Sequence, residues 1–376
     1  EEYAKQLIME KQLEEPFYLM DRGKLKRRWV QWTSNLPRIV PYYAVKCNND
    51  PGLLDLLISL GAGFDCASEA EVARICAAGG DPSKIVFGSP CKMPCHINYA
   101  VDAGVKLTVY DSVGELYKTK KYWPNANLLL RIREDDPNAR CQLGSKYGAN
   151  ADEFAELLES AKTLGLNVVG VAFHVGSGAS DPHAFYRAVQ TASHVFDMGT
   201  TYGFKMEVLD VGGGFPGGGT PAGEKQFSEI AMCLNSALDE YFPPSRHVQL
   251  IAEPGRFFAE NSATLVTNIL GNRVRKIYDE DGGVSSNVYE YWIGDGLYGN
   301  MNCIMYDHAE LNARPLKVVS SGVGDQDLKR SVVFGPSCDG LDTVLHDVKL
   351  PELEYGDWLY FPEMGAYTMV AASAFN

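Results

Sequence analysis

The feature that most constrains the fold is an alternation of short apolar runs with longer amphipathic stretches between residues 39 and 252. Short apolar runs bounded by turn residues are typical of buried strands, and the amphipathic stretches are typical of helices that cover them. The eight predicted strands are Ile39–Val45, Gly63–Cys66, Ile85–Phe87, Leu107–Tyr110, Asn127–Ile132, Val168–Val175, Met206–Asp210 and Val248–Ala252. Predicted helices between them include Pro51–Leu60, Ser68–Ala77, Ala151–Thr163, Pro182–Met198 and Phe227–Tyr241. Eight such units predict an α/β fold, a closed (β/α)₈ barrel with its functional residues at the carboxyl ends of the strands.

After residue 260 the sequence consists of β-branched and aromatic runs separated by turn-rich segments, which predicts a second, all-β domain. The predicted strands there are Thr264–Ile269, Val288–Ile293, Lys317–Val319 and Trp358–Phe361. We therefore expect a barrel domain over residues 21–262 and a β domain built from residues 1–20 and 263–376. Asp279–Asn287 and Ser320–Asp327 are predicted to be disordered.

Lys46 ends the first predicted strand, within Pro-Tyr-Tyr-Ala-Val-Lys-Cys. Lysine is rarely buried without a partner, and apolar surroundings disfavour its charged form. A neutral amine at the mouth of a barrel can form a Schiff base with a carbonyl group, so Lys46 is a candidate anchor for pyridoxal phosphate. The alternative for an isolated lysine is a side chain that reaches for solvent.

Polar or glycine-rich residues also follow other predicted strands, and all of these would lie on the same face of the barrel. They are Asp65, Arg131, His174, Ser177 between two glycines, Gly212–Gly214, and Glu253 with Arg256. Consecutive glycine amides can cradle a phosphate, and a hydroxyl and a guanidinium can complete such a site. Gly212–Gly217 also matches the dinucleotide fingerprint, but it follows the seventh strand rather than the first. The other alternative is that these glycine-rich segments are only turns at strand ends and bind no phosphate.

His174 and Glu253 have both a structural and a functional interpretation. A histidine after a strand can be a core residue, or its flat ring can stack on a planar cofactor. Glu253 can pair with Arg256, or it can accept a hydrogen bond from a pyridine nitrogen and keep the ring protonated as an electron sink. The spacing of histidine, cysteine, aspartate and glutamate matches no metal-ligand pattern, so we expect no metal.

A net charge of −14 argues against nonspecific binding to nucleic acid or to anionic membranes, and it suits a small cationic substrate. Nine cysteines without a Cys-x-x-Cys pair point to reduced thiols, which predicts a cytoplasmic protein. No apolar stretch is long enough to span a bilayer. Because the chain begins with Glu1 rather than methionine, a removed targeting peptide stays an open alternative.

Seven ordered motifs resemble those of eukaryotic-type ornithine decarboxylases, which belong to the alanine-racemase-like branch of pyridoxal phosphate decarboxylases. The motifs are Pro-Tyr-Tyr-Ala-Val-Lys-Cys-Asn, Gly-Phe-Asp-Cys-Ala-Ser, Phe-His-Val-Gly-Ser-Gly, Leu-Asp-Val-Gly-Gly-Gly-Phe-Pro-Gly, Glu-Pro-Gly-Arg, Tyr-Asp-His and Gly-Pro-Ser-Cys-Asp-Gly-Leu-Asp. The similarity runs from Pro16 to Asn376.

The resemblance implies that the barrel domain binds pyridoxal phosphate. Lys46 would form the Schiff base, His174 would stack on the ring and Glu253 would pair with the pyridine nitrogen. The phosphate would be held by Ser177, Gly212, Gly213, Gly214, Gly255, Arg256 and Tyr367. Asp65, Glu71 and Arg131 match positions that line the cofactor and orient the lysine.

The resemblance also implies a head-to-tail homodimer with shared active sites, in which Cys338 and Asp339 serve the other subunit. Cys338 matches the thiol that directs protonation of the α-carbon. Asp307 and Asp339 match acids that bind the distal ammonium, Tyr306 and Phe375 match walls of the substrate pocket, and Lys146 with Asp342 match an ion pair across the interface.

The implied reaction is decarboxylation of L-ornithine to putrescine and CO₂ in polyamine biosynthesis. Alternatives are a decarboxylase of lysine or another basic amino acid, and a non-catalytic relative that binds the regulatory protein antizyme. A nicotinamide-dependent barrel oxidoreductase using Gly212–Gly217 is a third alternative. Antizyme is also a possible partner of an active enzyme of this family.

Overall fold

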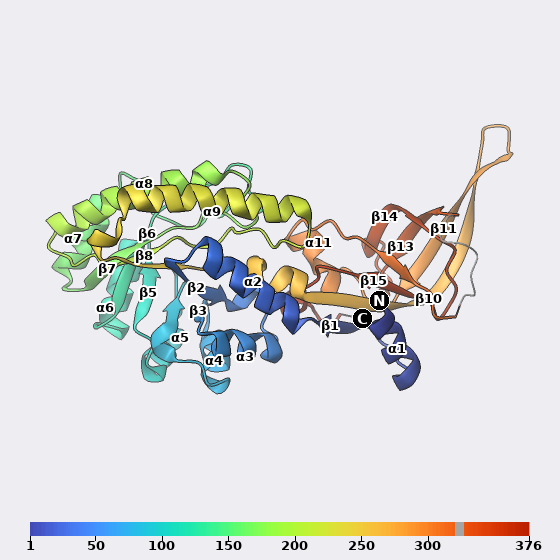
Figure 1. Ribbon diagram of the computed structural model, residues 1–376, viewed down its shortest axis with the longest axis horizontal. Coiled ribbons are helices and arrows are strands. Elements are labelled where there is room, and N and C mark those ends of the chain that lie inside the picture. The colour runs from blue at the N-terminus through green and yellow to red at the C-terminus, as the bar shows by residue number, and fades with distance from the viewer. Residues whose placement is uncertain (320–326, 376) are drawn as a thin grey trace. The chain divides into compact units, whose positions relative to one another are not determined.

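The computed structural model describes residues 1–319 and 327–375. The chain separates into two compact units (Figure 1). One contains Arg22–Ala259, and the other contains Glu1–Asp21 and Glu260–Asn376. Among the described helices, none combines the length and apolar character needed to cross a membrane.

The unit formed by Arg22–Ala259 is built on a closed barrel of eight strands, each hydrogen-bonded in parallel to the next. The strands are β2 (Ile39–Ala44), β3 (Gly63–Cys66), β4 (Ile85–Phe87), β5 (Leu107–Tyr110), β6 (Asn127–Arg131), β7 (Asn167–Ala172), β8 (Val208–Asp210) and β9 (Gln249–Ala252). β9 pairs with β2, which closes the barrel without a free edge. The predicted (β/α)₈ fold is confirmed.

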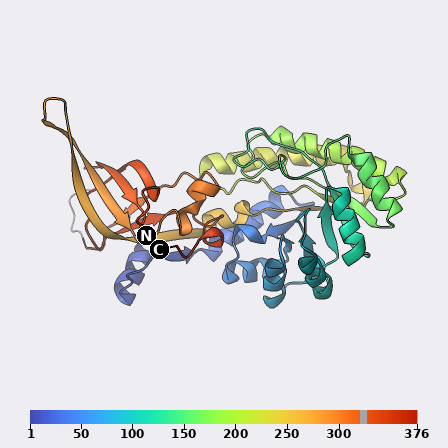
Figure 2. The ribbon, with the colours of Figure 1, turned by 180° about the vertical axis from the view of Figure 1, so that it is seen from behind.

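Helices cover the outside of the barrel, as Figures 1 and 2 show. They are α2 (Arg22–Asn35), α3 (Pro51–Leu60), α4 (Glu69–Ala77), α5 (Pro94–Ala103), α6 (Val113–Tyr122), α7 (Phe154–Thr163), α8 (Pro182–Thr201), α9 (Pro221–Tyr241) and the short α10 (Arg256–Ala259). Several begin at side-chain caps: Ser68 accepts a hydrogen bond from the Glu71 amide, and Asp50 accepts one from Leu53. Because each helix runs back along the barrel, these capped starts lie at the carboxyl ends of the strands.

The second unit is a seven-stranded sheet of β1 (Phe17–Met20), β10 (Ala263–Tyr278), β11 (Val284–Ile293), β12 (Arg314–Leu316), β13 (Lys329–Phe334), β14 (Thr343–Leu350) and β15 (Trp358–Phe361). The strand order is β12-β15-β10-β11-β13-β14, and β1 also pairs with β10. The helix α1 (Glu2–Lys11) and the short α11 (Cys303–Tyr306) belong to the same unit. Its core contains Leu265, Ile269, Tyr291, Ile293 and Val333.

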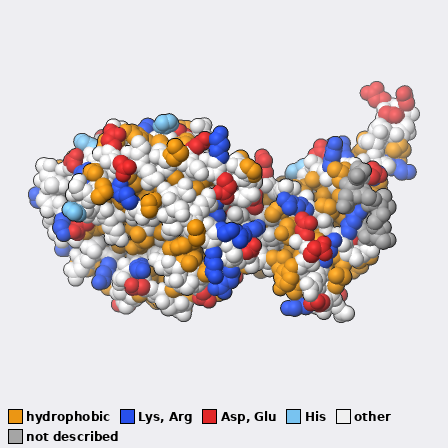
Figure 3. Space-filling view, in the orientation of Figure 1, with side chains coloured by type: hydrophobic (Ala, Val, Ile, Leu, Met, Phe, Trp, Pro, Cys, Tyr) orange, Lys and Arg blue, Asp and Glu red, His pale blue; other side chains and the backbone are white. Residues whose placement is uncertain are grey.

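The expectation of disorder over Asp279–Asn287 is wrong for most of the segment. β11 begins at Val284, and Lys276 pairs with Asn287 in the β10–β11 hairpin. Asp279 closes the turn, because its Oδ1 accepts a hydrogen bond from the Gly283 amide at 2.7 Å. The tip of this hairpin carries acidic side chains (Figure 3), and such polar residues resemble a disordered segment when read from sequence alone.

The predicted strand Lys317–Val319 is also wrong in position, because β12 is Arg314–Leu316. The amides of Val318 and Val319 donate to Asp357 Oδ1, at 2.9 and 3.0 Å, so they are not available to a strand ladder. β12 contains Pro315 and lies at one end of the strand order, where a residue without an amide hydrogen is tolerated. The other segment expected to be disordered, Ser320–Asp327, lies outside the described residues except for Asp327.

Candidate active site

Functional side chains gather at the carboxyl ends of the barrel strands. Lys46 lies in a 3₁₀ turn, Val45–Cys47, that directly follows β2, and Asp65 lies near the end of β3. Arg131 is the last residue of β6, and His174 follows β7 after one intervening residue. Glu253 follows β9 directly.

Lys46 forms an ion pair with Asp65 through its Nζ and the Oδ2 of the carboxylate. The Asp65 side chain is fully buried, whereas that of Lys46 is 41% exposed. The expected surroundings of apolar neighbours are therefore incomplete, because a buried carboxylate also lies beside the amine. The pair fixes the position of the amine at the barrel mouth.

Three acidic side chains, Asp65, Asp210 and Glu253, lie within one electrostatic cluster. Burial, followed by the charges of Asp65 and Asp210, raises the pKa of Glu253 well above its usual value. Burial also raises the pKa of Asp210 to about 7, although the Gly212 amide donates to its Oδ1 at 2.9 Å. The buried Oδ1 of Asp65 accepts no hydrogen bond within the described part of the chain. Lys46 and Arg131 are the cations that lower the pKa of Glu253.

The cluster thus holds three acidic groups against two basic ones, and it favours one further positive charge. Asp210 was not predicted as a member. The signal was its place before the triple glycine in Leu-Asp-Val-Gly-Gly-Gly, which drew attention to the glycines alone.

His174 is held as a neutral ring. Its Nδ1 accepts a hydrogen bond from the Gly176 amide at 3.0 Å, so the ring proton resides on Nε2. Burial and the nearby charges of Arg131 and Lys46 lower the pKa of His174 to about 3. A neutral imidazole at neutral pH is suited to stacking on a planar ring.

Ser177 and Arg256 are brought together from the loops after β7 and β9. The Arg256 Nη2 donates to the Ser177 Oγ at 3.2 Å, and Arg256 is buried with 5% of its surface exposed. A buried guanidinium beside a hydroxyl is an arrangement that binds phosphate oxygens.

The glycines beside this pair are required by close packing. A Cβ on Gly212 would lie 1.9 Å from the Phe173 carbonyl oxygen, and Gly212 has a φ of +66°. A Cβ on Gly213 would lie 2.7 Å from His174 Nε2, and one on Gly255 would lie 2.8 Å from the Cys47 Cβ. The loops therefore approach each other at distances that only glycine permits.

Glu71 is partly buried and Lys146 is exposed. Glu71 Oε2 accepts from the Ala67 amide at 2.6 Å, and burial raises the pKa of its carboxyl group. Lys146 is exposed and lies over the Tyr147 ring, with Nζ 5.1 Å from the centroid. Arg131 lies over the same ring at 5.2 Å.

The remaining predicted residues belong to the other unit. Asp339 accepts hydrogen bonds from the Tyr298 hydroxyl and, at 3.0 Å, from the Leu341 amide, and these bonds lower its pKa. The Phe375 ring packs on Tyr298 with centroids 4.4 Å apart. Tyr298 was missed from sequence; its only signal is the glycine-flanked Gly-Leu-Tyr-Gly segment.

Cys338 and Tyr306 are exposed, whereas Asp307 and Asp342 are buried. The carboxylate of Asp342 accepts from the Leu297 amide at 2.8 Å and from the Ser337 amide at 3.0 Å. Tyr367 has a φ of 55°, in the left-handed region that a tyrosine rarely adopts, and such strain is common at functional sites.

The barrel residues fit pyridoxal phosphate. The Ser177–Arg256 pair with its glycine loops suits a phosphate, the neutral His174 suits a flat ring, and the excess of buried carboxylates suits a protonated pyridine nitrogen. Lys46 supplies the amine for the aldehyde.

Comparison with known proteins agrees with this fit. The family model of the pyridoxal-binding domain of pyridoxal-dependent decarboxylases matches residues 22–260. A chloroplastic ornithine decarboxylase from Nicotiana glutinosa is 47% identical over 96% of this chain and 82% of its own length. The ornithine decarboxylase of Schizosaccharomyces pombe is 45% identical over 96% of this chain and 81% of its own length.

Among solved structures, the arginine decarboxylase of Paramecium bursaria Chlorella virus superimposes with a TM-score of 0.91 at 39% identity, covering 100% of this chain and 96% of that one. Two independent similarities, in sequence and in three-dimensional structure, thus coincide with a site whose residues fit the cofactor. The chain belongs to the pyridoxal-dependent decarboxylase family.

Proposed function

We propose that this chain decarboxylates L-ornithine to putrescine and CO₂ and so serves polyamine biosynthesis. The observation that carries the proposal is the cluster of buried carboxylates beside Lys46 and the phosphate-binding loops. Two relatives that are named ornithine decarboxylases support the choice of ornithine as substrate. They are 45% and 47% identical to this protein over nearly its whole length.

The cofactor would be held by residues from several loops. Ser177, Gly212, Gly213, Gly214, Gly255, Arg256 and Tyr367 would bind its phosphate, and Asp65, Glu71 and Arg131 would line its surroundings. The neutral His174 would stack on its ring, and Glu253 would pair with its pyridine nitrogen. When bound, pyridoxal phosphate supplies the sink for the electron pair of the breaking bond between Cα and the carboxylate.

Asp65 would position the amine of Lys46. Its Oδ2 contacts the Lys46 Nζ, which would hold the amine in place for nucleophilic attack. Lys46 would then return to release the product amine. Cys338 would deliver a proton to the α-carbon as a general acid.

The substrate would be recognised by its second cationic group. Asp307 and Asp339 would bind the distal ammonium, and Tyr306 and Phe375 would wall the pocket. The low pKa of Asp339 keeps it ionised and suited to a cation, because the Leu341 amide and the Tyr298 hydroxyl stabilise its charge.

A parallel turnover assay on ornithine, lysine and arginine tests the proposal. Ornithine and lysine differ by one methylene, which a pocket discriminates by about 10–200-fold in kcat/KM. We expect ornithine to lead by a factor in that range, with one CO₂ and one putrescine formed per substrate. Preference for arginine would favour the function named for the viral structural neighbour instead.

We also propose that the active unit is a homodimer, with Cys338 and Asp339 serving the other copy and Lys146 pairing with Asp342 across the interface. The exposure of Cys338 and Lys146 supports this arrangement. Mixing inactive Lys46→Ala and Cys338→Ala subunits should restore part of the activity, because one site in the mixed dimer then has both groups. If the subunits are shown to exchange and no activity returns, the proposal of a shared active site is refuted.

The second candidate is a non-catalytic relative that binds antizyme. The residues that such a protein could lose, including Lys46, Glu253, Arg256, Cys338 and Tyr367, are present here. Visible absorbance of the purified protein separates the two, since a lysine-bound cofactor absorbs there. Consumption of added NADPH would instead favour an oxidoreductase.

Antizyme binding by the active enzyme and a cytoplasmic location complete the proposal, and both rest on family resemblance and cysteine usage. Co-purification with antizyme and cell fractionation test them. Recovery of the protein in plastids would instead match the name of the Nicotiana relative.

A further inference from the structure

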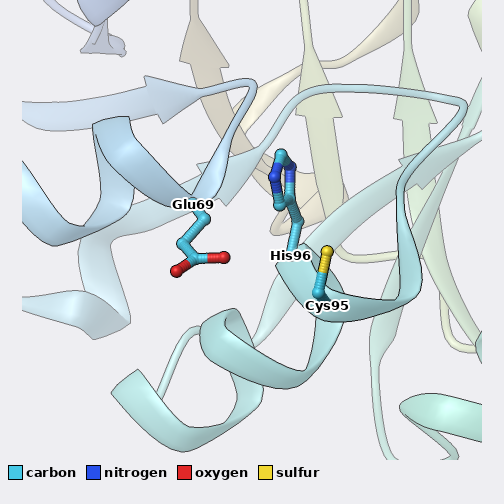
Figure 4. Close-up of side chains that lie close together, drawn as sticks. All are labelled: Glu69, Cys95 and His96. Carbon is cyan, nitrogen blue, oxygen red and sulfur yellow. The ribbon is translucent and has the colours of Figure 1, made fainter.

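Three side chains with metal-binding atoms lie together on the barrel unit, outside the proposed cofactor site. They are Glu69, Cys95 and His96, and Figure 4 shows their side chains close together. One carboxylate oxygen, the Cys95 thiol and one ring nitrogen all lie within 4.8 Å of one another. Glu69 and His96 are partly exposed and Cys95 is exposed, so a dissolved ion can reach them.

The fold creates this cluster from two neighbouring strand–helix units. Glu69 is the first residue of α4, which Ser68 caps, and Cys95 and His96 lie in the first turn of α5. Both helices begin at the carboxyl ends of their strands, β3 and β4, and they pack against each other. Sequence spacing predicted no metal because Glu69 lies in a different strand–helix repeat from Cys95 and His96.

The loop that leads into α5, the helix with two of the three side chains, is fixed by a buried lysine. Lys92 Nζ donates to the carbonyl oxygens of Ser89 and Val109, each at 2.9 Å, and forms an ion pair with Glu115 at 2.8 Å. Ser89 Oγ in turn donates to the Cys91 carbonyl oxygen at 3.1 Å. The start of α5 is therefore held in place, which reduces the ordering needed to bind an ion.

We propose that Glu69, Cys95 and His96 bind a zinc-class divalent cation, with a water molecule as the fourth ligand. Thiolate, imidazole and carboxylate are the ligand types of Zn²⁺, and three protein ligands with one open position form a common zinc geometry. Ligand atoms around a tetrahedral zinc ion are separated from one another by roughly 3.5 Å. Side-chain rotations that move the three ligand atoms by about an ångström are therefore enough to bring them to that separation.

The charges of the site balance with this ion. A carboxylate and a thiolate neutralise the two charges of the cation, which offsets the unfavourable effect of the positive ends of α4 and α5. Binding converts the Cys95 S–H into a metal–sulfur bond and releases one proton to solvent.

The ion would join the first turns of α4 and α5, which are reached through the loops that follow β3 and β4. The second of these loops begins at Gly88, where a Cβ would lie only 2.1 Å from Asp65 Oδ1. An ion at Glu69, Cys95 and His96 therefore restrains backbone that packs against the partner of Lys46. We expect Zn²⁺ to raise the melting temperature of the protein, because it binds the folded arrangement of the two loops.

The experiment uses the cofactor-loaded protein and two probes. Co²⁺ should give a thiolate-to-cobalt charge-transfer band, and Zn²⁺ affinity is measured by competition with a chromophoric chelator. The variants Glu69→Gln, Cys95→Ser and His96→Gln should each weaken Zn²⁺ binding by at least about 10-fold, since even partners of metal ligands contribute 10–100-fold. Cys95→Ser should also abolish the band.

Cys91→Ser is the matched control, because Cys91 is an exposed thiol in the loop just before α5 but not a member of the cluster. It should keep both the band and the affinity. The proposal is overturned if wild-type protein gives no band, or if the band is lost in Cys91→Ser and kept in Cys95→Ser. Visible absorbance and melting temperature without metal establish that each variant is folded.

Discussion

The glycine loop after β8 offers a quantitative test of the proposed cofactor site. Gly213 has ordinary backbone geometry, so alanine there is limited by space alone. Its Cβ would lie 2.7 Å from His174 Nε2 and 2.9 Å from the Glu253 carbonyl oxygen. Both distances are shorter than real Cβ contacts, and the second involves backbone, which cannot rotate away. The residues that must move are the two proposed to hold the cofactor ring.

Overpacking of this kind costs about 1–3 kcal/mol. For Gly213→Ala we therefore expect a lower melting temperature, by about 2–4 °C per kcal/mol for a unit of this size. A comparable loss in cofactor binding raises its dissociation constant by about 5–150-fold, because 1.4 kcal/mol corresponds to tenfold. Titration of the cofactor-free protein, followed by visible absorbance, measures the affinity, and thermal unfolding measures stability.

Gly114→Ala is the control for this experiment. Gly114 lies in α6, is exposed, and has open space where a Cβ would stand. Alanine should stabilise the helix there by about 0.5–1 kcal/mol and leave cofactor binding unchanged. If Gly213→Ala binds the cofactor as tightly as Gly114→Ala, the loop does not position His174 and Glu253, and the reasoning fails.

Three further predictions follow from the charges at the barrel mouth. Glu253→Gln should lower kcat by roughly 10²–10³-fold, the loss typical of removing one preorganised electrostatic partner. It should also make the cofactor-free protein more stable, because it removes a buried carboxyl group whose ionisation is opposed; a less stable variant would contradict that cause. Borohydride reduction followed by peptide mass analysis should place the cofactor on Lys46, and a label on another lysine would refute the anchor. Because the folded pKa of Asp210 is raised to about 7, this group stabilises the cofactor-free protein at low pH, and the stabilisation is lost as pH rises from about 4 to about 7. Asp210→Asn should reduce the fall in unfolding free energy over this pH range, as measured by denaturant titrations at several pH values. An unchanged fall would count against the raised pKa of Asp210.

The barrel could be predicted from sequence because its strands are buried on both sides. Gly63–Cys66, Ile85–Phe87 and Leu107–Tyr110 were predicted with the observed limits, since each is a short apolar run between turn residues. The runs that end in functional residues were predicted too long: Val168–Val175 extends past the observed end of β7 at Ala172. There the apolar pattern continues through Phe173 and Val175 while the backbone turns away to present His174.

The second unit was harder because its local signals compete with tertiary contacts. The acidic turn at Asp279 resembles a disordered segment, yet the strands on either side of it pair with each other. Val318 and Val319 have high strand propensity, but the Asp357 carboxylate takes their amides. The first outcome depends on the pairing of the two flanking strands, and the second depends on a partner distant in sequence.

The charge cluster could not be foreseen for the same reason, and it also explains how the barrel can bind its cofactor. Each of Asp65, Asp210 and Glu253 ends or follows a different strand, so only barrel closure brings them together. Without the cofactor, Glu253 and Asp210 hold raised pKa values because burial and the charge of Asp65 oppose their ionisation. A protonated pyridine nitrogen would favour the ionised form of Glu253, so a carboxyl group whose ionisation is opposed in the cofactor-free protein gains a partner when a cationic ring binds. The unfavourable burial of this carboxyl group is thus offset on binding, which is why the stability of Glu253→Gln and its activity should change in opposite directions.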